Sequence, residues 1–194
     1  KYELEKCIYL SQNGRPGPTW IDIPLDLQAK NIDPKSLKSF KPGKNKIIKF
    51  EKEIAKISNL IKKSSRPVIV IGNGVHVSNS KKLTKELINI LNIPVLSSWN
   101  ASDIISTNHN KYIGRFGLFG DRASNFTIQK SDLVIVLGCR LSQPQTGYNL
   151  SLFAPNAKFI YVDIDVKEIS KLKDKNITKI VVDLRLFLEK FIKY

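Results

Sequence analysis

Short apolar runs alternate with amphipathic segments over most of the chain after residue 48. The runs are rich in Val, Ile and Leu and are bounded by Gly, Pro, Ser or Asp, which predicts strands at 68–71, 94–97, 133–137, 159–162 and 180–182. Elsewhere apolar residues recur every three or four positions, which predicts helices at 49–63, 80–91, 123–129 and 184–192 and one that begins at 166. Because the short runs are apolar throughout, we expect strands that are covered on both faces. The pattern therefore predicts an α/β fold: a Rossmann-like three-layer domain with a mostly parallel sheet of about six strands.

The first 47 residues follow a different pattern. Residues 1–13 have the composition of a helix end, and Thr19–Ile23 alternates as a strand does. One strand and one partial helix cannot bury a core, so residues 1–28 are predicted to be the end of another domain. Residues 29–47 are rich in Lys, Asn and Pro, which is typical of a linker. The main domain is then 48–194, and within it residues 99–122 are predicted to form a long loop.

The chain is strongly basic, with 32 Lys and Arg against 17 Asp and Glu and a net charge of +15. Nearly all of the excess is scattered lysine, whereas phosphate and base recognition favours arginine, so the pattern favours a solvated surface over nucleic-acid binding. No apolar run is long enough to span a membrane, and nothing like a signal peptide opens the chain. Cys7 and Cys139 have no metal-ligand spacing. We therefore expect free thiols in a reducing compartment, the cytoplasm, and no metal site.

Candidate ligand-binding residues follow the predicted strands, because open parallel sheets bind ligands at the carboxyl ends of their strands. In chain order, the residues that follow these strands are Gly72–Gly74, Ser98 and Trp99, Gly138–Arg140, Asp163, and Asp183. The amides of Gly72–Gly74 and the guanidinium of Arg140 are expected to meet phosphates. Asp163 is expected to accept hydrogen bonds from a ribose. Together these residues predict a dinucleotide cleft.

Other interpretations stay open at this point. Gly-Asn-Gly after a strand can be a tight turn alone, and Val77 stands where a third fingerprint glycine would be. No acidic residue follows the second strand, which disfavours NAD. His76 and His109 lack partners for catalysis or metal binding and are assigned surface or packing roles. Of Asp163 and Asp165, one is expected to cap the next helix.

Several of these segments are similar to one known family. Gly14–Gln28 resembles the end of the pyrimidine-binding domain of thiamine-diphosphate-dependent enzymes. The segments that resemble the central domain of the same enzymes are Arg66–Gly74, Pro94–Ser98, Phe116–Gly120, Leu137–Arg140, Thr146–Gly147 and Tyr161–Asp165. They occur in the family's order along the whole chain, and the nearest likeness is to the acetolactate synthase large subunit.

The resemblance implies a parent enzyme of three domains that decarboxylates a 2-oxo acid such as pyruvate and passes the carbanion to an acceptor. Thiamine diphosphate and Mg²⁺ would bind between the outer domains of paired subunits, in a homodimer or homotetramer. The activating glutamate of the first domain and the Gly-Asp-Gly motif of the third are not in this chain, so it should be non-catalytic by itself. In the synthases the central domain binds FAD, and in relatives it binds ADP or nothing, so the nucleotide site is either working or vestigial. The alternative is a stand-alone nucleotide- or flavin-binding module.

Matched residue by residue, the resemblance gives each strand-end segment a cofactor-binding role. Gly72, Asn73 and Gly74 match the turn beside the phosphate and ribitol chain, and Ser98 and Trp99 match the contacts after the second strand. Gly117, Leu118, Phe119 and Gly120 match the glycine loop at the flavin side. Gly138, Cys139 and Arg140 match the phosphate-facing segment, while Asp163, Ile164 and Asp183 match the adenosine end. The chain departs from the synthases at Ser142 and Pro144, where they have an acidic and a basic residue.

Overall fold

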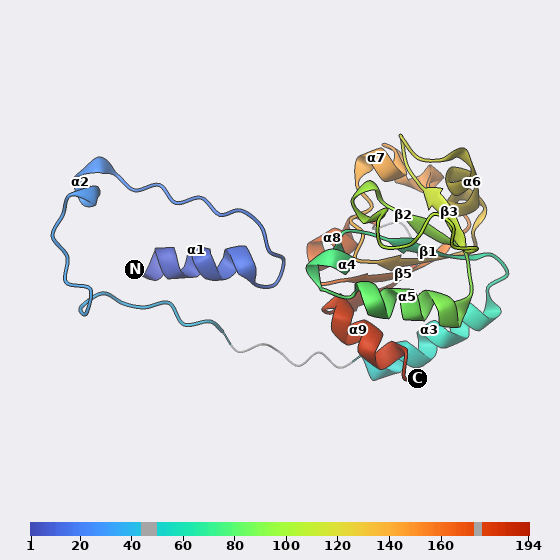
Figure 1. Cartoon of the computed structure of the whole chain (residues 1–194), viewed down its shortest axis with the longest axis horizontal. Coiled ribbons are helices and arrows are strands. Elements are labelled where there is room, and N and C mark those ends of the chain that lie inside the picture. The colour runs from blue at the N-terminus through green and yellow to red at the C-terminus, as the bar shows by residue number, and fades with distance from the viewer. Residues whose placement is uncertain (44–49, 173–175) are drawn as a thin grey trace. The chain divides into compact units, whose positions relative to one another are not determined.

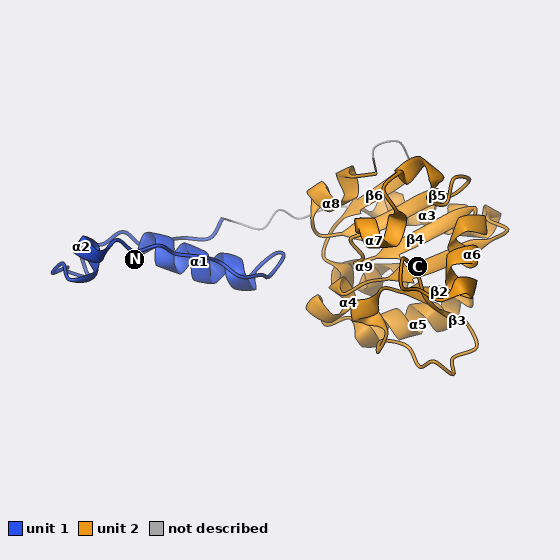
Figure 2. Cartoon of the chain, turned by 90° about the horizontal axis from the view of Figure 1, so that it is seen from above, with its two compact units in different colours: residues 1–47 blue, residues 48–194 orange. Residues whose placement is uncertain are grey.

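The computed structural model describes residues 1–43, 50–172 and 176–194. The chain divides into two compact units, Lys1–Ile47 and Ile48–Tyr194, called below the N-terminal unit and the α/β unit (Figure 2). None of the helices in the described ranges is long and apolar enough to cross a membrane. The assignment of residues 1–28 to the end of a pyrimidine-binding domain and of 29–47 to a linker stays a prediction.

Residues 1–43 of the N-terminal unit form two helices, α1 (Tyr2–Gln12) and α2 (Leu25–Gln28). No residue of α1 is buried, and its described contacts include several with Phe40. The rings of Tyr2 and Tyr9 lie 5.5 and 5.4 Å from the ring of Phe40, and Glu5 Oε2 accepts the Phe40 amide at 2.7 Å. Residues 1–43 therefore form no core comparable to that of the α/β unit.

The strand predicted at Thr19–Ile23 is wrong for this structure. The segment carries no strand in the described part of the unit, and Trp20 within it is 91% exposed. A strand forms by pairing its amides and carbonyls with a neighbouring strand, and the described residues of this unit supply no such neighbour.

A six-stranded sheet forms the centre of the α/β unit. Its strands are β1 (Pro67–Ile71), β2 (Val95–Ser97), β3 (Tyr112–Arg115), β4 (Leu133–Leu137), β5 (Lys158–Asp163) and β6 (Ile177–Val181). Their order across the sheet is β3-β2-β1-β4-β5-β6, and every neighbouring pair is parallel. In the middle of the sheet, Ile69 of β1 lies between Val95 of β2 and Ile135 of β4. The predicted fold class is confirmed.

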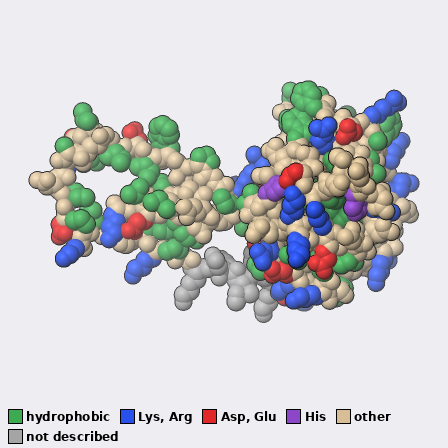
Figure 3. All heavy atoms as spheres, in the orientation of Figure 1, with side chains coloured by type: hydrophobic (Ala, Val, Ile, Leu, Met, Phe, Trp, Pro, Cys, Tyr) green, Lys and Arg blue, Asp and Glu red, His purple; other side chains and the backbone are tan. Residues whose placement is uncertain are grey.

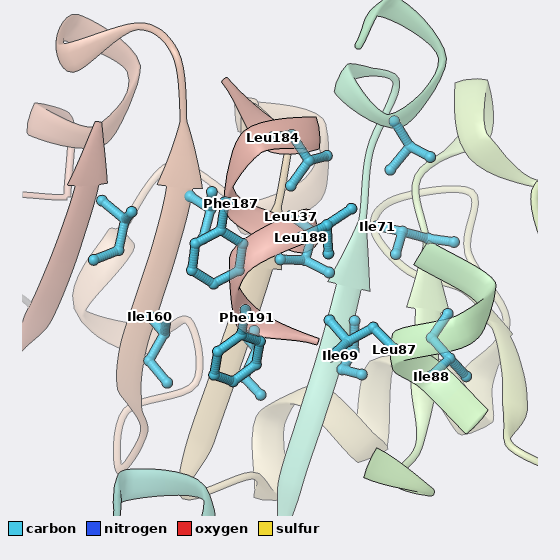
Figure 4. Packing of buried hydrophobic residues seen from close by; sticks show 14 of the residues in the cluster. Ile69, Ile71, Leu87, Ile88, Leu137, Ile160, Leu184, Phe187, Leu188 and Phe191 are labelled. Carbon is cyan, nitrogen blue, oxygen red and sulfur yellow. The ribbon is translucent and has the colours of Figure 1, made fainter. Parts of the chain in front are cut away.

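Helices cover both faces of the sheet, which gives three layers (Figure 1). The helices of this unit are α3 (Glu51–Lys63), α4 (Gly74–Val77), α5 (Lys81–Leu91), α6 (Arg122–Lys130), α7 (Gln143–Thr146), α8 (Val166–Ser170) and α9 (Leu184–Phe191). On one face α3, α5 and α9 pack on Ile69, Ile71 and neighbouring strand residues (Figure 4). On the other face α6 and α8 pack on Val68 and Val70. Successive strand residues enter opposite clusters, which explains why the strands are apolar throughout.

Three elements differ from the sequence-based expectation. β3 lies inside the predicted loop 99–122. The sequence did not predict this strand because Tyr-Ile-Gly-Arg contains a glycine and only one of its four residues is buried. β6 covers Ile177–Val181 rather than 180–182, and its exposed Lys179 breaks the apolar run. α3 begins at Glu51, while residue 49 of the predicted helix lies outside the described residues.

Deleting residues 1–30 should leave the α/β unit cooperatively folded, because its two apolar clusters are formed by residues 50–192. The expected result is one thermal transition, followed by circular dichroism, with a Tm close to that of the complete chain. The substitution Ile57→Ala, which empties a buried position in α3, should lower Tm in both the truncated and the complete chain. A non-cooperative melt after the deletion would show that the first 30 residues belong to this core.

Candidate functional site

All six strands end at the same side of the sheet, here called the carboxyl edge, because they are all parallel. From β1 the chain moves outward to β2 and β3, and from β4 it moves the other way to β5 and β6. The strand order therefore reverses between β1 and β4, which is where open α/β sheets form ligand crevices. Gly72–Gly74 follow β1 and Gly138–Arg140 follow β4, so the structure brings these two predicted segments together at that point.

The turns after β1 and β4 pack backbone against backbone. The Gly72 amide donates to the Leu137 carbonyl at 3.0 Å, and the Gly74 amide donates to the Gly138 carbonyl at 2.8 Å. A Cβ on Gly72 would lie 2.6 Å from Cys139 Cβ, and one on Gly74 would lie 2.6 Å from Gly138 Cα. Both glycines are thus needed for the close approach of the two turns. The amides of Gly72 and Gly74, which were expected to meet phosphates, donate hydrogen bonds to carbonyls of Leu137 and Gly138 instead.

Arg140 is a cation at the carboxyl edge, close to the end of β4. Its side chain is 60% exposed, and its Nε donates to Oε1 of Glu168 at 3.1 Å. Glu168 lies in α8, directly after β5, and its side chain is only 5% exposed. Arg140 follows the buried strand β4, as its sequence position implies, and its contact with a phosphate stays a prediction.

Cys139 is a packing residue rather than a reactive thiol. It is almost completely buried, and burial raises the pKa of its thiol to about 12, so the thiol stays neutral at physiological pH. The carbonyl of Cys139 accepts the hydroxyl of Tyr161, on β5, at 2.7 Å. Burial also raises the pKa of Tyr161, which keeps this hydroxyl a donor.

Aromatic and aliphatic side chains are exposed on the other half of the carboxyl edge. Ser98 is buried, and its amide donates to the Ile71 carbonyl at 2.9 Å. The ring of Trp99 lies 5.2 Å from that of Phe119, while Leu118 and Phe119 are largely exposed. Figure 3 shows hydrophobic side chains gathered at the top of the α/β unit, where Figure 1 places α7. A flat apolar ring system could lie against this surface.

The loop Gly117–Gly120 is fixed by its neighbours. The Gly117 amide donates to Asn125 Oδ1 at 2.9 Å, and the amide of Leu118 donates to the Pro144 carbonyl at 2.7 Å. Gly117 has a φ of +107°, and the Gly120 amide donates back to its carbonyl at 2.9 Å. The predicted glycine loop is therefore a rigid turn that leans on the segment after β4.

The acidic residues after β5 and β6 begin helices. Asp163 Oδ1 accepts the Asp165 amide at 2.9 Å, and Asp165 Oδ1 accepts the Lys167 amide at 2.8 Å as the N-cap of α8. The prediction that one of this pair caps a helix is confirmed, and the residue is Asp165. Asp183 caps α9 by accepting the Arg185 amide at 2.9 Å. Ile164 is partly exposed. Asp163, Ile164 and Asp183, the residues assigned to the adenosine end, lie at the ends of the parallel neighbours β5 and β6 and therefore on the same edge of the sheet.

The side chains of both histidines make hydrogen bonds at the surface. His76 Nε2 lies 2.9 Å from Oδ1 of Asp103, and Lys81 Nζ lies 3.0 Å from its Oδ2. These hydrogen bonds, from Lys81 first, lower the pKa of Asp103 to about 2. His109 Nε2 lies 3.2 Å from Asn89 Oδ1. Among the described residues there is no group of three or more His, Cys, Asp or Glu that could hold a metal ion.

Residues 54–191 match the family described as the central domain of thiamine pyrophosphate enzymes. The chain belongs to this family. The whole chain is 37% identical over 191 residues, 95% of its length, to a probable acetolactate synthase large subunit of Methanococcus aeolicus. It is 33% identical over 174 residues to the isozyme 1 large subunit of Escherichia coli. It covers 31% and 30% of those two proteins, so the chain spans about a third of the length of the curated relatives it matches.

The fold of the central domain also matches solved structures. An X-ray structure of a proposed thiamin diphosphate-dependent enzyme from Mycobacterium smegmatis aligns with a TM-score of 0.75 and 16% sequence identity. The alignment covers 98% of this chain and 36% of that one. At this identity the likeness supports the fold and nothing about the ligand.

Three residues of the central domain that shape the carboxyl edge were not predicted: Glu168, Asn125 and Gln145. Glu168 and Gln145 each stand three positions after an N-cap residue, which is the capping-box spacing and could have singled them out. Gln145 does complete a capping box with Ser142, the position where the synthases have an acidic residue. Asn125 has no comparable signal, because its partner, the backbone of Gly117, lies 8 residues before it, outside the spacing of a capping box.

Proposed function

We propose that this chain is the central domain of a longer thiamine-diphosphate-dependent enzyme that resembles acetolactate synthase. The parent would decarboxylate a 2-oxo acid such as pyruvate and transfer the resulting carbanion to an acceptor, as a homodimer or homotetramer in the cytoplasm. The observation that carries this proposal is the 37% identity that runs through 191 residues to a probable acetolactate synthase large subunit.

The described residues do not fit thiamine diphosphate or Mg²⁺ themselves. The chain contains no Gly-Asp-Gly motif, and the described ranges hold no cluster of carboxylates or histidines suited to a metal ion. We therefore assign both cofactors to parts of the parent outside residues 1–194, and the chain alone is expected to be non-catalytic.

An adenine nucleotide, FAD or ADP, fits the carboxyl edge in part. Arg140 offers an exposed guanidinium for a phosphate, and Trp99 with Phe119 offers exposed rings for a flat ring system. The amides of Gly72 and Gly74 are already hydrogen-bonded, so the phosphate contact depends mainly on Arg140. The nucleotide would contribute binding and structure, and no step of the reaction is assigned to it.

The complete protein that contains this chain should consume pyruvate when thiamine diphosphate and Mg²⁺ are supplied. The 194-residue chain should neither consume pyruvate nor bind thiamine diphosphate tightly, because the matching motifs are absent. Pyruvate consumption and isothermal calorimetry, each run on both proteins, measure this difference. Micromolar binding of thiamine diphosphate to the 194-residue chain would contradict the assignment of that site to other domains.

The substitution Arg140→Ala should weaken ADP binding to the chain by roughly ten- to a hundredfold, the loss of one or two charge-assisted contacts to phosphate. The matched control is Arg115→Ala, which replaces the half-exposed last residue of β3, an arginine that lies 3.8 Å from the carboxylate of Asp121. Calorimetry with ADP should give a much smaller loss for this control. Equal losses would mean that general positive charge, rather than Arg140, attracts the nucleotide.

A further inference from the structure

Glu168 is a buried carboxylate placed beside the predicted phosphate-binding arginine. A buried carboxylate is unfavourable unless it is paired with cations or hydrogen-bond donors. Oε1 of Glu168 accepts the Nε of Arg140 at 3.1 Å, and Oε2 pairs with the ammonium of Lys171 in the next turn of chain. Both cations are about half exposed, so the carboxylate lies underneath and its partners lie at the surface.

The contact between Arg140 and Glu168 uses the Nε of the guanidinium and not the two terminal nitrogens. In the described part of the chain, the Nε of Arg140 is the only nitrogen of its guanidinium with a hydrogen bond or ion pair. The two terminal nitrogens carry the remaining four N–H groups, and the side chain is 60% exposed. Holding the Nε therefore fixes the plane of the guanidinium while its fork of donors stays available to an anion.

The two cations outnumber the carboxylate that lies between them. Arg140 and Lys171 share the single negative charge of Glu168, so the three groups together keep one positive charge. Asp163 and Asp165 are further carboxylates on the described part of this edge, and their Oδ1 atoms accept backbone amides at the start of α8.

The backbone next to Arg140 is held as well. The completely buried Tyr161 donates its hydroxyl to the carbonyl of Cys139, the residue before Arg140. The Gly138 amide donates to the Val162 carbonyl at 3.0 Å. Arg140 is thus fixed at its backbone by β5 and at its side chain by α8.

We propose that Glu168 is a positioning residue: it holds Arg140 with the terminal nitrogens turned outward so that they bind a phosphoryl group of the nucleotide. The proposal rests on the nucleotide site proposed above. It gives α8 a role that goes beyond covering the sheet, because the buried carboxylate of this helix orients the binding arginine of a neighbouring strand.

Two substitutions separate the hydrogen bond from the charge. Glu168→Gln and Glu168→Met both remove the negative charge and nearly keep the volume, but only Gln keeps an oxygen that can accept the Nε of Arg140. Both are made in the 194-residue chain and in the same chain with Arg140→Ala, and ADP affinity is measured by calorimetry. Glu189→Gln, in an exposed pair with Arg185 on α9, is the matched control and should leave the affinity unchanged.

If Glu168 positions Arg140, the Gln variant should bind ADP at least as tightly as the unsubstituted chain, and the Met variant about tenfold more weakly than the Gln variant, a loss typical of outer-shell partners. In the Arg140→Ala chain the two variants should bind alike. Equal affinities of the Gln and Met variants in the chain with Arg140 would overturn the positioning role while leaving the nucleotide site intact. Absence of ADP and FAD binding to the unsubstituted chain would overturn both.

A second measurement does not depend on substitution or ligand. The Nε–H of Arg140 should exchange with water more slowly than that of Arg115 in nitrogen-15 NMR spectra of the unsubstituted chain. Of these two arginines, Arg140 donates its Nε–H at hydrogen-bonding distance, whereas the Nε of Arg115 lies 3.8 Å from Asp121. Equal exchange rates would mean that Glu168 does not hold Arg140 in solution.

Discussion

Replacing Phe187 with alanine is expected to lower the free energy of unfolding by about 3–5 kcal/mol, the range for large buried aromatic residues. Phe187 of α9 is 1% exposed and belongs to the cluster that covers one face of the sheet (Figure 4). Its ring lies 6.0 Å from that of Phe50 and 5.2 Å from that of Phe191, so its removal leaves a cavity that two aromatic neighbours cannot both fill. Urea denaturation followed by circular dichroism measures the loss.

The matched control is Phe126→Ala, in α6 of the same unit. Phe126 is 56% exposed, and its recorded ring contact is with the side chain of Arg122 on the same helix. Its replacement should cost less than about 1 kcal/mol, as exposed substitutions do. Similar losses for the two variants would show that the packing of α9 on the sheet is not a main source of stability.

The substitution Gly72→Ala should lower the free energy of unfolding by about 3 kcal/mol, at the upper end of overpacking costs. The new methyl group would lie 2.6 Å from Cys139 Cβ and still closer to Cys139 Cα, and a backbone atom cannot move aside as a side chain can. The turns after β1 and β4 would have to separate, which also breaks the bond from the Gly72 amide to the Leu137 carbonyl. The same denaturation experiment gives the value.

Gly17→Ala serves as the control for this glycine, because no atom lies within 4 Å of the position of its Cβ. It should leave the unfolding of the α/β unit unchanged. If Gly72→Ala were equally harmless, the close approach of the two turns would not persist in solution, and the Gly72 and Gly74 amides would be free for a ligand.

The sequence was sufficient to predict the strands that lie in the interior of the sheet. β1, β4 and β5 are buried on both faces, so nearly every residue in them is apolar and the signal is strong. The edge strands are different, since β3 is half-buried and β6 alternates with exposed Lys179. Which residues of an edge strand are buried depends on the elements packed against it, and these are far from the strand in the sequence. Thr19–Ile23 shows the reverse case, because its alternation fits a strand that has no partner in the described part of its unit.

At the candidate site, position was predictable and hydrogen bonding was not. The residues after each strand could be assigned to one edge because parallel strands end together, and the structure places them there. Which donors are free depends on contacts between turns. The Gly72 and Gly74 amides are used by β4 and its turn, Asp183 is used by α9, and Arg140 keeps free donors because Glu168 binds its Nε. The pairings of Gly72, Gly74 and Arg140 join segments that are far apart in the chain, so local spacing does not predict them.

The parallel sheet also constrains how the chain can be made and cut. β1 pairs with β4 in the centre of the sheet, but two strands, three α-helices and one short 3-10 helix lie between them in the sequence. On the ribosome β1 therefore emerges long before β4, and until then one of its sides is an open apolar edge that other chains can pair with. An expression fragment that stops between β3 and β4 should aggregate for this reason. A stable fragment must begin before α3 and continue through α9, whichever part of the site it is meant to carry.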